Sequence, residues 1–491
     1  EHDSCGVGFI ANIRGERSHT IVDRAVVGLK NLAHRGAIDA DAVTGDGSGI
    51  LTQIPYELFR DFLKSKGKQL FRESDLAICV VFLPQNDEYA EAHGRKIIRD
   101  AIDGEDLAFL AWREVPVNPT CLGKTAELSR PLILQALVGR KEKEENLTET
   151  EEADAFERSC FLAMKMAEKR AAEENFEDFY IVSFSNRTIT YKGLLSAPQI
   201  RRFFLDLRSP LYTCAFAIFH QRFATNTIPD WTRAQPYRML AHNGEINTIR
   251  GNRNLMRARG FASSFGIWND RFADLHPIIQ PEMSDSASFD NALQMIALSG
   301  RSSVESISMM MPASWEKDKG LPQKVRDFYH FHSTMIEPWD GPCAIVFTDG
   351  RFVGASLDRR GLRPLRYKVY DDGTIVMASE AGIIPDWGAK VVTNGRLGPS
   401  RMVAVDLKEK KLLEDGDRQS YLARLGDFGK WCRDSLHNLH DLSKAEAEYE
   451  EISVEPETVE ALQVVFGYHL DERELVLMPM VETGMEPLGS M

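Results

Sequence analysis

Apolar and polar positions divide the chain into short strands and amphipathic helices. Residues 5–13 (CGVGFIANI) form an apolar, β-prone run, which predicts a strand, and apolar residues at helical spacing predict a helix over 19–33. The same pattern predicts further strands at 78–83, 179–184, 188–191, 212–219, 343–347, 352–357, 365–369 and 374–378, and helices at 56–66 and 286–298. Strand-rich blocks at both ends of the chain, with helices between them, predict an α+β fold built of layers.

Two segments stand out by their charge. Residues 141–158 are dense in charged side chains, which predicts a solvated loop leading into a helix that ends near Glu174. Residues 431–491 hold 14 acidic and 3 basic residues and read as helical. The sequence stops there without a terminating element, so we expect residues 427–491 to be the beginning of a further domain cut from a longer polypeptide.

Composition excludes several classes of protein. The 491 residues are 43% hydrophobic and 27% charged, which excludes a disordered chain and a coiled-coil rod. The formal net charge is −14 and most of it lies in the last 61 residues, so the chain lacks the basic face of a nucleic-acid binder. No apolar stretch approaches the ~20 residues of a membrane span, and the first residues lack the apolar core of a signal peptide. We therefore expect neither nucleic acid nor membrane as a partner.

The cysteines are odd in number and scattered. None of the seven stands in a CxxC pair, so we expect neither a disulfide framework nor a zinc ribbon, and a reducing, cytoplasmic location. They are Cys5, Cys79, Cys121, Cys160, Cys214, Cys343 and Cys432.

Cys5 lies near the start of the chain and opens the first predicted strand. A single cysteine is most often a buried small hydrophobe, and the residue alone leaves that interpretation open. If Glu1–Ser4 were removed, Cys5 would carry a free α-amine, whose ordinary pKa of about 7.7–8.0 suits a general base. A terminal cysteine would then hold nucleophile and base on one residue.

The segment 220–227, His-Gln-Arg-Phe-Ala-Thr-Asn-Thr, directly follows the predicted strand 212–219. Polar residues at the end of a strand are common in functional sites. Arg222 could bind a carboxylate through its forked guanidinium, or it could be a surface arginine in a turn.

Asn243, Gly244 and Asp285 each allow two interpretations. Asn-Gly is a common hairpin signal, but the Asn243 amide and the Gly244 N–H could also form an oxyanion hole, in which one donor contributes about 2.7–4 kcal/mol. Asp285 is most simply the N-cap of helix 286–298, but its carboxylate could hold a substrate ammonium. A thiol nucleophile, two oxyanion donors and an Arg–Asp pair for an α-amino acid together describe a glutaminase.

Ten segments carry a resemblance to a known family. They are CGVGFIANI, AHRGA, TGDGSG, HQRFATNT, AQPYRMLAHNGEINT, GNRN, SDSASFDN, EPWDGP, LDRRGLRPLRY and ASEAG, and they run in order through essentially the whole chain. Together they closely resemble the N-terminal class II glutamine amidotransferase (glutaminase) region of glutamate synthase large chains. The resemblance implies the N-terminal-nucleophile (Ntn) hydrolase fold, a four-layer α/β/β/α sandwich. It also implies a propeptide over 1–4, the amidotransferase domain over 5–426, and the truncated start of the glutamate synthase central domain over 427–491.

The resemblance also implies a role for each candidate residue. Cys5 would attack the carboxamide of L-glutamine, giving a γ-glutamyl thioester and ammonia, and water would then release glutamate. Asn243 and Gly244 would form the oxyanion hole. Arg222 would bind the α-carboxylate of glutamine, and Asp285 would bind its α-amine. Two further residues, Arg35 and Gly36, would lie near the nucleophile.

The resemblance also implies a further reaction, cofactors and partners in the full-length enzymes. In them the ammonia converts 2-oxoglutarate to glutamate with FMN and an iron–sulfur cluster, so we expect no cofactor in this fragment. The implied partners are the remaining synthase domains, a reductase subunit or ferredoxin, and further copies in a homo-oligomer. With residues 1–4 attached, Cys5 has no free α-amine, and glutamine hydrolysis should be blocked.

Three alternatives remain open from the sequence. A class II amidotransferase of the phosphoribosyl-pyrophosphate type is supported by the RPLRY segment, but no acidic pair with a glycine/threonine phosphate loop accompanies it. An inert regulatory or interaction module, unprocessed at its start, is the second alternative. A metal hydrolase is the weakest, because His220 and His242 stand in no HxxxH or HxH spacing and are better explained as hydrogen-bonded core histidines.

Overall fold

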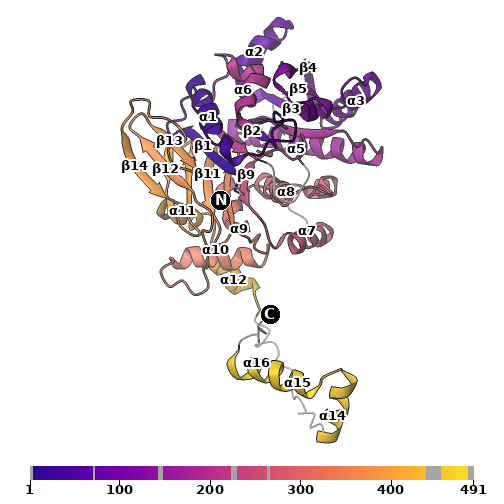
Figure 1. Cartoon of the computed structure of the whole chain (residues 1–491), viewed down its shortest axis with the longest axis vertical. Coiled ribbons are helices and arrows are strands. Elements are labelled where there is room, and N and C mark those ends of the chain that lie inside the picture. The colour runs from indigo at the N-terminus through magenta and orange to yellow at the C-terminus, as the bar shows by residue number, and fades with distance from the viewer. Residues whose placement is uncertain are drawn as a thin grey trace. The chain divides into compact units, whose positions relative to one another are not determined.

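A computed structural model describes residues 4–69, 72–141, 147–222, 229–262, 266–437 and 455–484 (Figure 1). The chain divides into two units, Glu1–Cys432 and Arg433–Met491. Every candidate site residue belongs to the first unit, whereas Glu1, His2 and Asp3 lie outside the described residues. No helix among the described residues is both long enough and apolar enough to cross a membrane.

The largest sheet has seven strands in the order β14-β12-β13-β1-β8-β2-β7, with every neighbouring pair antiparallel. Its strands are β1 (Gly6–Asn12), β2 (Ser48–Gln53), β7 (Thr188–Gly193), β8 (Phe216–Gln221), β12 (Arg366–Tyr370), β13 (Thr374–Ala378) and β14 (Val391–Arg396). The apolar run at the start of the chain lies in the middle of this sheet, because β1 is buried on both faces. The predicted strand 212–219 begins later than expected and runs to Gln221.

A second, five-stranded sheet has the order β16-β15-β11-β10-β9. Its strands are β9 (Leu240–Gly244), β10 (Cys343–Thr348), β11 (Phe352–Leu357), β15 (Met402–Asp406) and β16 (Lys411–Leu413). The two sheets face each other across an apolar layer to which β1 contributes Val7 and Phe9 and β10 contributes Ala344 and Val346. Cys5 directly precedes β1 and therefore lies at one end of this layer.

Helices cover the outer faces of both sheets. Helix α1 (His19–Asn31) packs Val22 in one apolar cluster with Phe219 of the larger sheet. On the other side, α8 (Asp285–Leu298), α9 (Ser303–Met310) and α10 (Gln323–Ser333) share a cluster with Ile345 and Phe347 of the smaller sheet. The layers are helix, sheet, sheet, helix, so the predicted four-layer α+β sandwich is confirmed (Figure 1).

A third sheet extends the fold beyond the prediction. Its strand order is β4-β5-β3-β6, formed by β3 (Leu76–Leu83), β4 (Leu107–Glu114), β5 (Leu132–Arg140) and β6 (Tyr180–Ser185). Helices α3 (Glu88–Gly104) and α5 (Glu149–Glu173) pack on it. The sequence pattern predicts only β3 and β6 of these strands.

Helix α5 corrects the interpretation of the charged segment 141–158 as a solvated face. The helix begins with a capping box in which Thr148 and Glu151 bond to each other's backbone N–H groups. Glu157, on the next turns, is buried and accepts hydrogen bonds from Ser185 Oγ (2.7 Å) and the Asn186 N–H (2.6 Å). The third sheet, which the pattern did not predict, supplies these partners. Residues 142–146 lie outside the described part of the chain.

The remaining helices connect these layers or belong to the second unit. In the first unit they are α2 (Tyr56–Ser65), α4 (Lys124–Leu128), α6 (Ile200–Phe203), α7 (Ile249–Ala262), α11 (Asp415–Leu422) and α12 (Phe428–Ser435), whose last residues enter the second unit. In the second unit they are α14 (Pro456–Val465), α15 (Leu470–Glu472), a π-helical turn (Arg473–Leu477) and α16 (Met478–Thr483).

Candidate active site

Side-chain alternation brings Cys5 and Asn243 together at one end of the space between the two sheets. Val7 of β1 and Ala241 of β9 point into the apolar layer. Side chains two residues apart on a strand share a face, so Cys5 and Asn243 point into the same layer. Both are buried, with 6% and 1% of their surface exposed.

The thiol of Cys5 lies among charged side chains of both signs. Burial raises its pKa to about 12, and the guanidinium of Arg222 opposes that increase most strongly. Asp46 and Asp285 raise the pKa of Cys5 further, whereas Arg363 lowers it. With residues 1–4 attached the thiol is therefore protonated near neutral pH. Since the thiolate is the nucleophile, attack requires a base at the moment of reaction.

Asn243 is held at a strand end and not in a hairpin turn. It pairs with Ala344 of β10, and Gly244 pairs with Cys343. The Asn243 amide has neither its Nδ2 nor its Oδ1 hydrogen-bonded to any described residue, although both atoms are buried. A buried polar group without a partner costs about 1–3 kcal/mol, so this amide is the kind of group that a ligand satisfies.

Gly244 follows in a conformation that requires glycine. Its φ of +135° lies in the region that side chains disfavour. A Cβ added at this position would lie 1.9 Å from the carbonyl oxygen of Pro342. The close approach of these two strands thus sets the position of the Gly244 N–H beside the Asn243 amide.

Asp285 is the first residue of α8 and not its N-cap, which corrects the simplest interpretation. Ser284 is the cap, accepting the N–H of Ala287 at 3.1 Å. The Asp285 carboxylate accepts the N–H of Ile246 (2.9 Å) and of Ser286 (2.7 Å). These bonds tie the segment after Gly244 to α8, and an ionised carboxylate has further lone pairs for an ammonium ligand.

Arg222 directly follows β8 and has a strained backbone conformation. Its φ is +90°, rare for a residue with a side chain, and its N–H donates to the carbonyl of Gly47 at 2.8 Å. Its Nε lies 3.8 Å from Oδ2 of Asp46. Such outliers cluster at functional sites. Residues 223–228, the rest of the predicted segment, lie outside the described residues.

Arg35 and Gly36 differ in what they contribute. The guanidinium of Arg35 donates to the carboxylate of Glu380, which also pairs with His34. Gly36 packs beside the site, since an added Cβ would lie 2.1 Å from Nε2 of Gln221 and 3.1 Å from Oδ1 of Asp46. The structure therefore gives Gly36 a steric role next to Asp46 and directs the Arg35 side chain to Glu380.

Two charged residues near Cys5 were missed by the sequence interpretation. Asp46 lies in the glycine-rich turn TGDGSG, and Arg363 lies in GLRPLRY, for which the sequence indicated no role in a glutaminase site. Burial raises the pKa of Asp46 to about 6, and its Oδ2 accepts no hydrogen bond from the described residues. For Asp46 the only available signal was a lone acidic residue between glycines. No sequence pattern singled out Arg363.

The two histidines that suggested a metal site are hydrogen-bonded within the core. His220 Nε2 lies 3.0 Å from the carbonyl of His242, and His242 Nδ1 lies 2.7 Å from Oγ of Ser286. Burial lowers the pKa of both, that of His220 to about 3. Within the described ranges, no three His, Cys, Asp or Glu side chains gather as a metal site.

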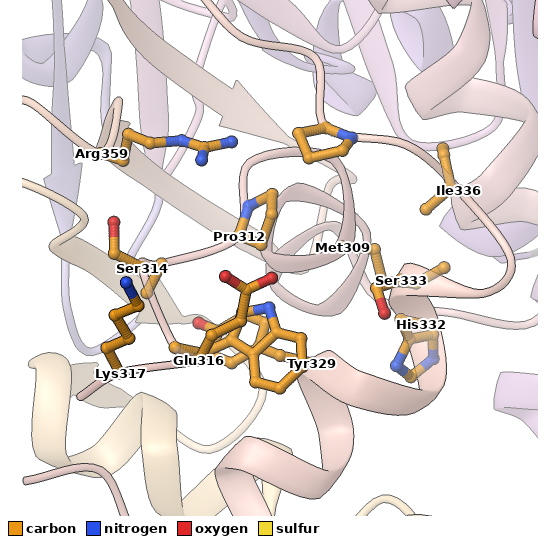
Figure 2. Close-up of a pocket in the computed structure, with 13 residues that line it drawn as sticks. Met309, Pro312, Ser314, Glu316, Lys317, Tyr329, His332, Ser333, Ile336 and Arg359 are labelled. Carbon is orange, nitrogen blue, oxygen red and sulfur yellow. The ribbon is translucent and has the colours of Figure 1, made fainter. Parts of the chain in front are cut away.

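A separate cavity of about 290 Å³ lies between the loop after α9 and helix α10 (Figure 2). Glu316 and Lys317 come from that loop, and Tyr329 and His332 come from α10. Arg359, on another wall, pairs with Asp340 at 3.4 Å. None of the seven candidate site residues lines this cavity, so it is distinct from the site around Cys5.

Comparisons with known proteins identify the family of this chain. The matching family is described as "Glutamine amidotransferases class-II", and the match covers residues 5–431. The glutamate synthase [NADPH] large chain of Azospirillum brasilense is 38% identical over 100% of this chain and 32% of that protein. Ferredoxin-dependent glutamate synthase 2 of Synechocystis is 39% identical over 99% of this chain and 30% of that protein. The glutamate synthase [NADPH] large chain of Bacillus subtilis is 37% identical over 100% and 31%.

The chain spans about a third of the length of these relatives. Among solved structures, "Structure of the allosteric regulatory enzyme of purine biosynthesis" aligns at a TM-score of 0.28 and 17% identity, over 46% of this chain and 40% of that chain, a level that carries no structural argument. The predicted Ntn-type sandwich is thus found in a chain whose family match begins at Cys5. Because that match covers most of the sequence, the chain belongs to the class-II glutamine amidotransferases.

Proposed function

We propose that this chain hydrolyses L-glutamine to glutamate and ammonia through a thioester on Cys5. One observation carries the proposal: a buried cysteine, the strained Arg222 and the Asn243 amide, which has no hydrogen bond among the described residues, lie at the same end of the sandwich. They supply a nucleophile, an oxyanion donor and a cation for a carboxylate.

The reaction proceeds in two steps in which every atom is accounted for. The Cys5 sulfur bonds to the side-chain carbonyl carbon of glutamine, and the thiol proton passes to the α-amine of Cys5 and from there to the leaving nitrogen. The C–N bond breaks, ammonia departs and the γ-glutamyl thioester remains. Water then adds to the thioester carbon, the C–S bond breaks, and the sulfur regains a proton as glutamate leaves. An α-amine is a suitable base because its ordinary pKa is about 7.7–8.0.

The other residues bind substrate and developing charge. The Asn243 amide and the Gly244 N–H receive the oxyanion, and Arg222 holds the α-carboxylate of glutamine. Asp285 holds the α-amine with the lone pairs that its two backbone bonds leave open. Gly36 keeps the space beside the nucleophile clear, and we place Arg35 at the edge of the site through Glu380.

The base exists only if Glu1–Ser4 are removed. The start of the family match at Cys5 supports a propeptide over residues 1–4 and an amidotransferase domain over 5–426. With the four residues attached the chain is an inactive precursor, which is the form that the inert-module alternative describes.

We propose further that the ammonia serves a glutamate synthase reaction, from 2-oxoglutarate to glutamate, carried by domains beyond this chain. Similarity to glutamate synthases over 99–100% of this chain favours this over a phosphoribosyl-pyrophosphate amidotransferase. Residues 427–491 would then begin the central domain. Electrons would come from a reductase subunit or ferredoxin, in a cytoplasmic homo-oligomer.

FMN and an iron–sulfur cluster belong to those further domains in this proposal. A cluster requires several cysteine thiolates within reach of one another. The seven cysteines are buried at scattered positions, and no three potential metal ligands meet within the described residues. The residues present do not fit a cluster, and no step of the glutaminase reaction passes through one.

Replacement of the nucleophile tests the proposal. We expect Cys5→Ala, prepared with its first residue at position 5, to lose glutamine hydrolysis to background, measured as ammonia released. Cys121→Ala is the matched control, because Cys121 is also buried but lies near α4, in an apolar cluster that does not include Cys5. Hydrolysis retained by the Cys5 variant at the wild-type rate would contradict the proposal.

A further inference from the structure

Arg363 occupies a rigid turn that leads toward the nucleophile. Asp358, at the start of the turn, accepts the N–H groups of Arg360 (2.9 Å) and Gly361 (3.1 Å) on one carboxylate oxygen. Its other oxygen accepts the N–H of Cys343 at 3.3 Å. Since Cys343 pairs with Gly244, the turn that carries Arg363 is tied to the strand pair of the oxyanion hole.

The side chain of Arg363 reaches the residue directly before the nucleophile. Its Nη1 donates to Oγ of Ser4 at 2.7 Å. Its Nε is buried and donates to no described residue. The guanidinium also acts electrostatically on Cys5 and His242, which places its charge beside the thiol and the oxyanion strand. The reaction steps proposed above do not use this group.

The charges around Cys5 show why a second cation matters. Arg222 already shares its charge with Asp46, 3.8 Å away, and under the proposed function it also binds the α-carboxylate of glutamine. In the absence of substrate, Arg222 lowers the pKa of Cys5 more than Arg363 does, but with glutamine bound two carboxylates face the Arg222 guanidinium and its effect on the sulfur decreases. Arg363 donates to the neutral hydroxyl of Ser4 and forms no ion pair among the described residues, so no carboxylate there offsets its charge.

We propose that Arg363 is the charge partner of the Cys5 thiolate: it holds the Ser4 hydroxyl while residues 1–4 are present and stabilises the sulfur anion once they are gone. The inference rests on the proposed function for the identity of Cys5 as nucleophile. Arg363 is not one of the residues proposed above as nucleophile, oxyanion donor or substrate-binding residue.

Alkylation of Cys5 as a function of pH tests the proposal without using glutamine. The chain beginning at Cys5, verified by intact mass, is treated with iodoacetamide, and Cys5 modification is quantified by peptide mapping. An opposite charge at close range lowers the pKa of a thiol by about 1–3 units. For Arg363→Gln we expect the midpoint of the alkylation curve to rise by about one unit, so the rate at pH 7.5 falls about tenfold. Arg363→Lys keeps the charge and should stay near wild type.

Arg366→Gln is the matched control, since Arg366 lies three residues on and is exposed on β12. Its alkylation curve should overlay that of the wild type. If the curves of Arg363→Gln and wild type coincide, the proposal is wrong. If Arg363→Gln does not fold, the alkylation curve of Arg363→Lys decides. A rise of its midpoint by a full unit, although the positive charge is retained, would contradict the proposal. Arg363-dependent alkylation in a chain that hydrolyses no glutamine would overturn the proposed function and leave this inference intact.

Discussion

The Nε of Arg222 lies 3.8 Å from Oδ2 of Asp46, inside a site that also contains the buried thiol of Cys5. Asp46 reaches this position because Gln221 donates to its Oδ1 at 3.2 Å and Gly36 leaves room beside it. Its carboxylate faces the arginine at the Nε edge. Under the proposed function, the same guanidinium also binds the α-carboxylate of glutamine.

Asp46→Asn should stabilise the fold in a pH-dependent way. The pKa of Asp46 in the folded chain, about 6, lies above the ordinary value of 3.8. Between those pH values the folded chain binds more protons than the unfolded chain, so the contribution of Asp46 to the free energy of unfolding falls as pH rises. A pKa difference of about two units corresponds to about 3 kcal/mol in the free energy of unfolding. The wild type loses this stability by pH 7, and Asp46→Asn recovers it.

Denaturant unfolding of the variant and the wild type at pH 4, 5, 6 and 7 measures this difference. The stability gain of Asp46→Asn should grow with pH up to about 6 and then level off. Asp39→Asn, an exposed aspartate in the same loop, is the control and should show no such trend. A gain that is constant or shrinks with pH would contradict the assignment.

Asn243→Ala should reduce kcat for glutamine by about 10²–10³, with a smaller effect on KM, because an oxyanion donor acts mainly in the transition state. The variant should not lose the stability that removal of a hydrogen bond costs, because the Asn243 amide has no partner among the described residues. Asn118→Ala offers the contrast. Asn118 caps a short helical turn through the Thr120 N–H at 3.2 Å, so its loss should cost about 1 kcal/mol and leave kcat intact. Steady-state kinetics with chemical unfolding of both variants separates the two roles.

Gly244→Ala should destabilise the chain and abolish activity together. The added Cβ would lie 1.9 Å from the Pro342 carbonyl oxygen, and φ is +135°. Backbone strain of this kind costs about 1–3 kcal/mol before the steric clash is added. Gly251→Ala in α7, where no atom lies within 4 Å of the new Cβ, should instead gain up to about 1 kcal/mol. Thermal unfolding of the pair is the measurement, and equal Tm shifts would show that the Gly244 conformation is not constrained.

Asp285→Asn should raise KM for glutamine about 10- to 100-fold with a smaller effect on kcat, since it removes the charge that faces the substrate ammonium. The Asn carbonyl can still accept the Ile246 N–H, now made by the carboxylate at 2.9 Å, so the fold should persist. A glutamine analogue that lacks the α-amine, 4-carbamoylbutanoate, provides the control. Wild type and variant should hydrolyse it equally well. A variant that is equally impaired on both substrates would place Asp285 in a structural role only.

Local pattern predicted several strands of the two facing sheets but missed β2, β9, β14, β15 and β16. The strand of residues 5–13 and the strands near 343–357 were predicted because continuous apolar runs bounded by turns are typical of buried strands. Leu107–Glu114 and Leu132–Arg140 were missed although each contains an apolar run, unbroken over 107–112 in the first and broken only at Gln135 over 132–138 in the second. Their strand conformation depends on pairing within the third sheet and on the helices packed over it.

The site was predicted where one residue carries its own chemical signal, as Cys5 does near the start of the chain. The Asn-Gly hairpin signal at Asn243 was overridden because its strand partner, β10, lies about 100 residues further along the chain. Asp46 and Arg363 were missed for the same reason. Their segments reach the nucleophile because β2 pairs with β8 and β12 pairs with β13, and β8 and β13 both flank β1.

The most direct test of the thioester mechanism is the identity of the residue that reacts with a glutamine-like electrophile. The chain beginning at Cys5 is incubated with the diazoketone analogue of glutamine, digested and mapped by mass spectrometry, alongside the chain that retains Glu1–Ser4. The account predicts one adduct, on Cys5, formed in the shortened chain and blocked by excess glutamine, with little or none in the longer chain. An adduct on another residue, or equal labelling of both chains, would contradict it.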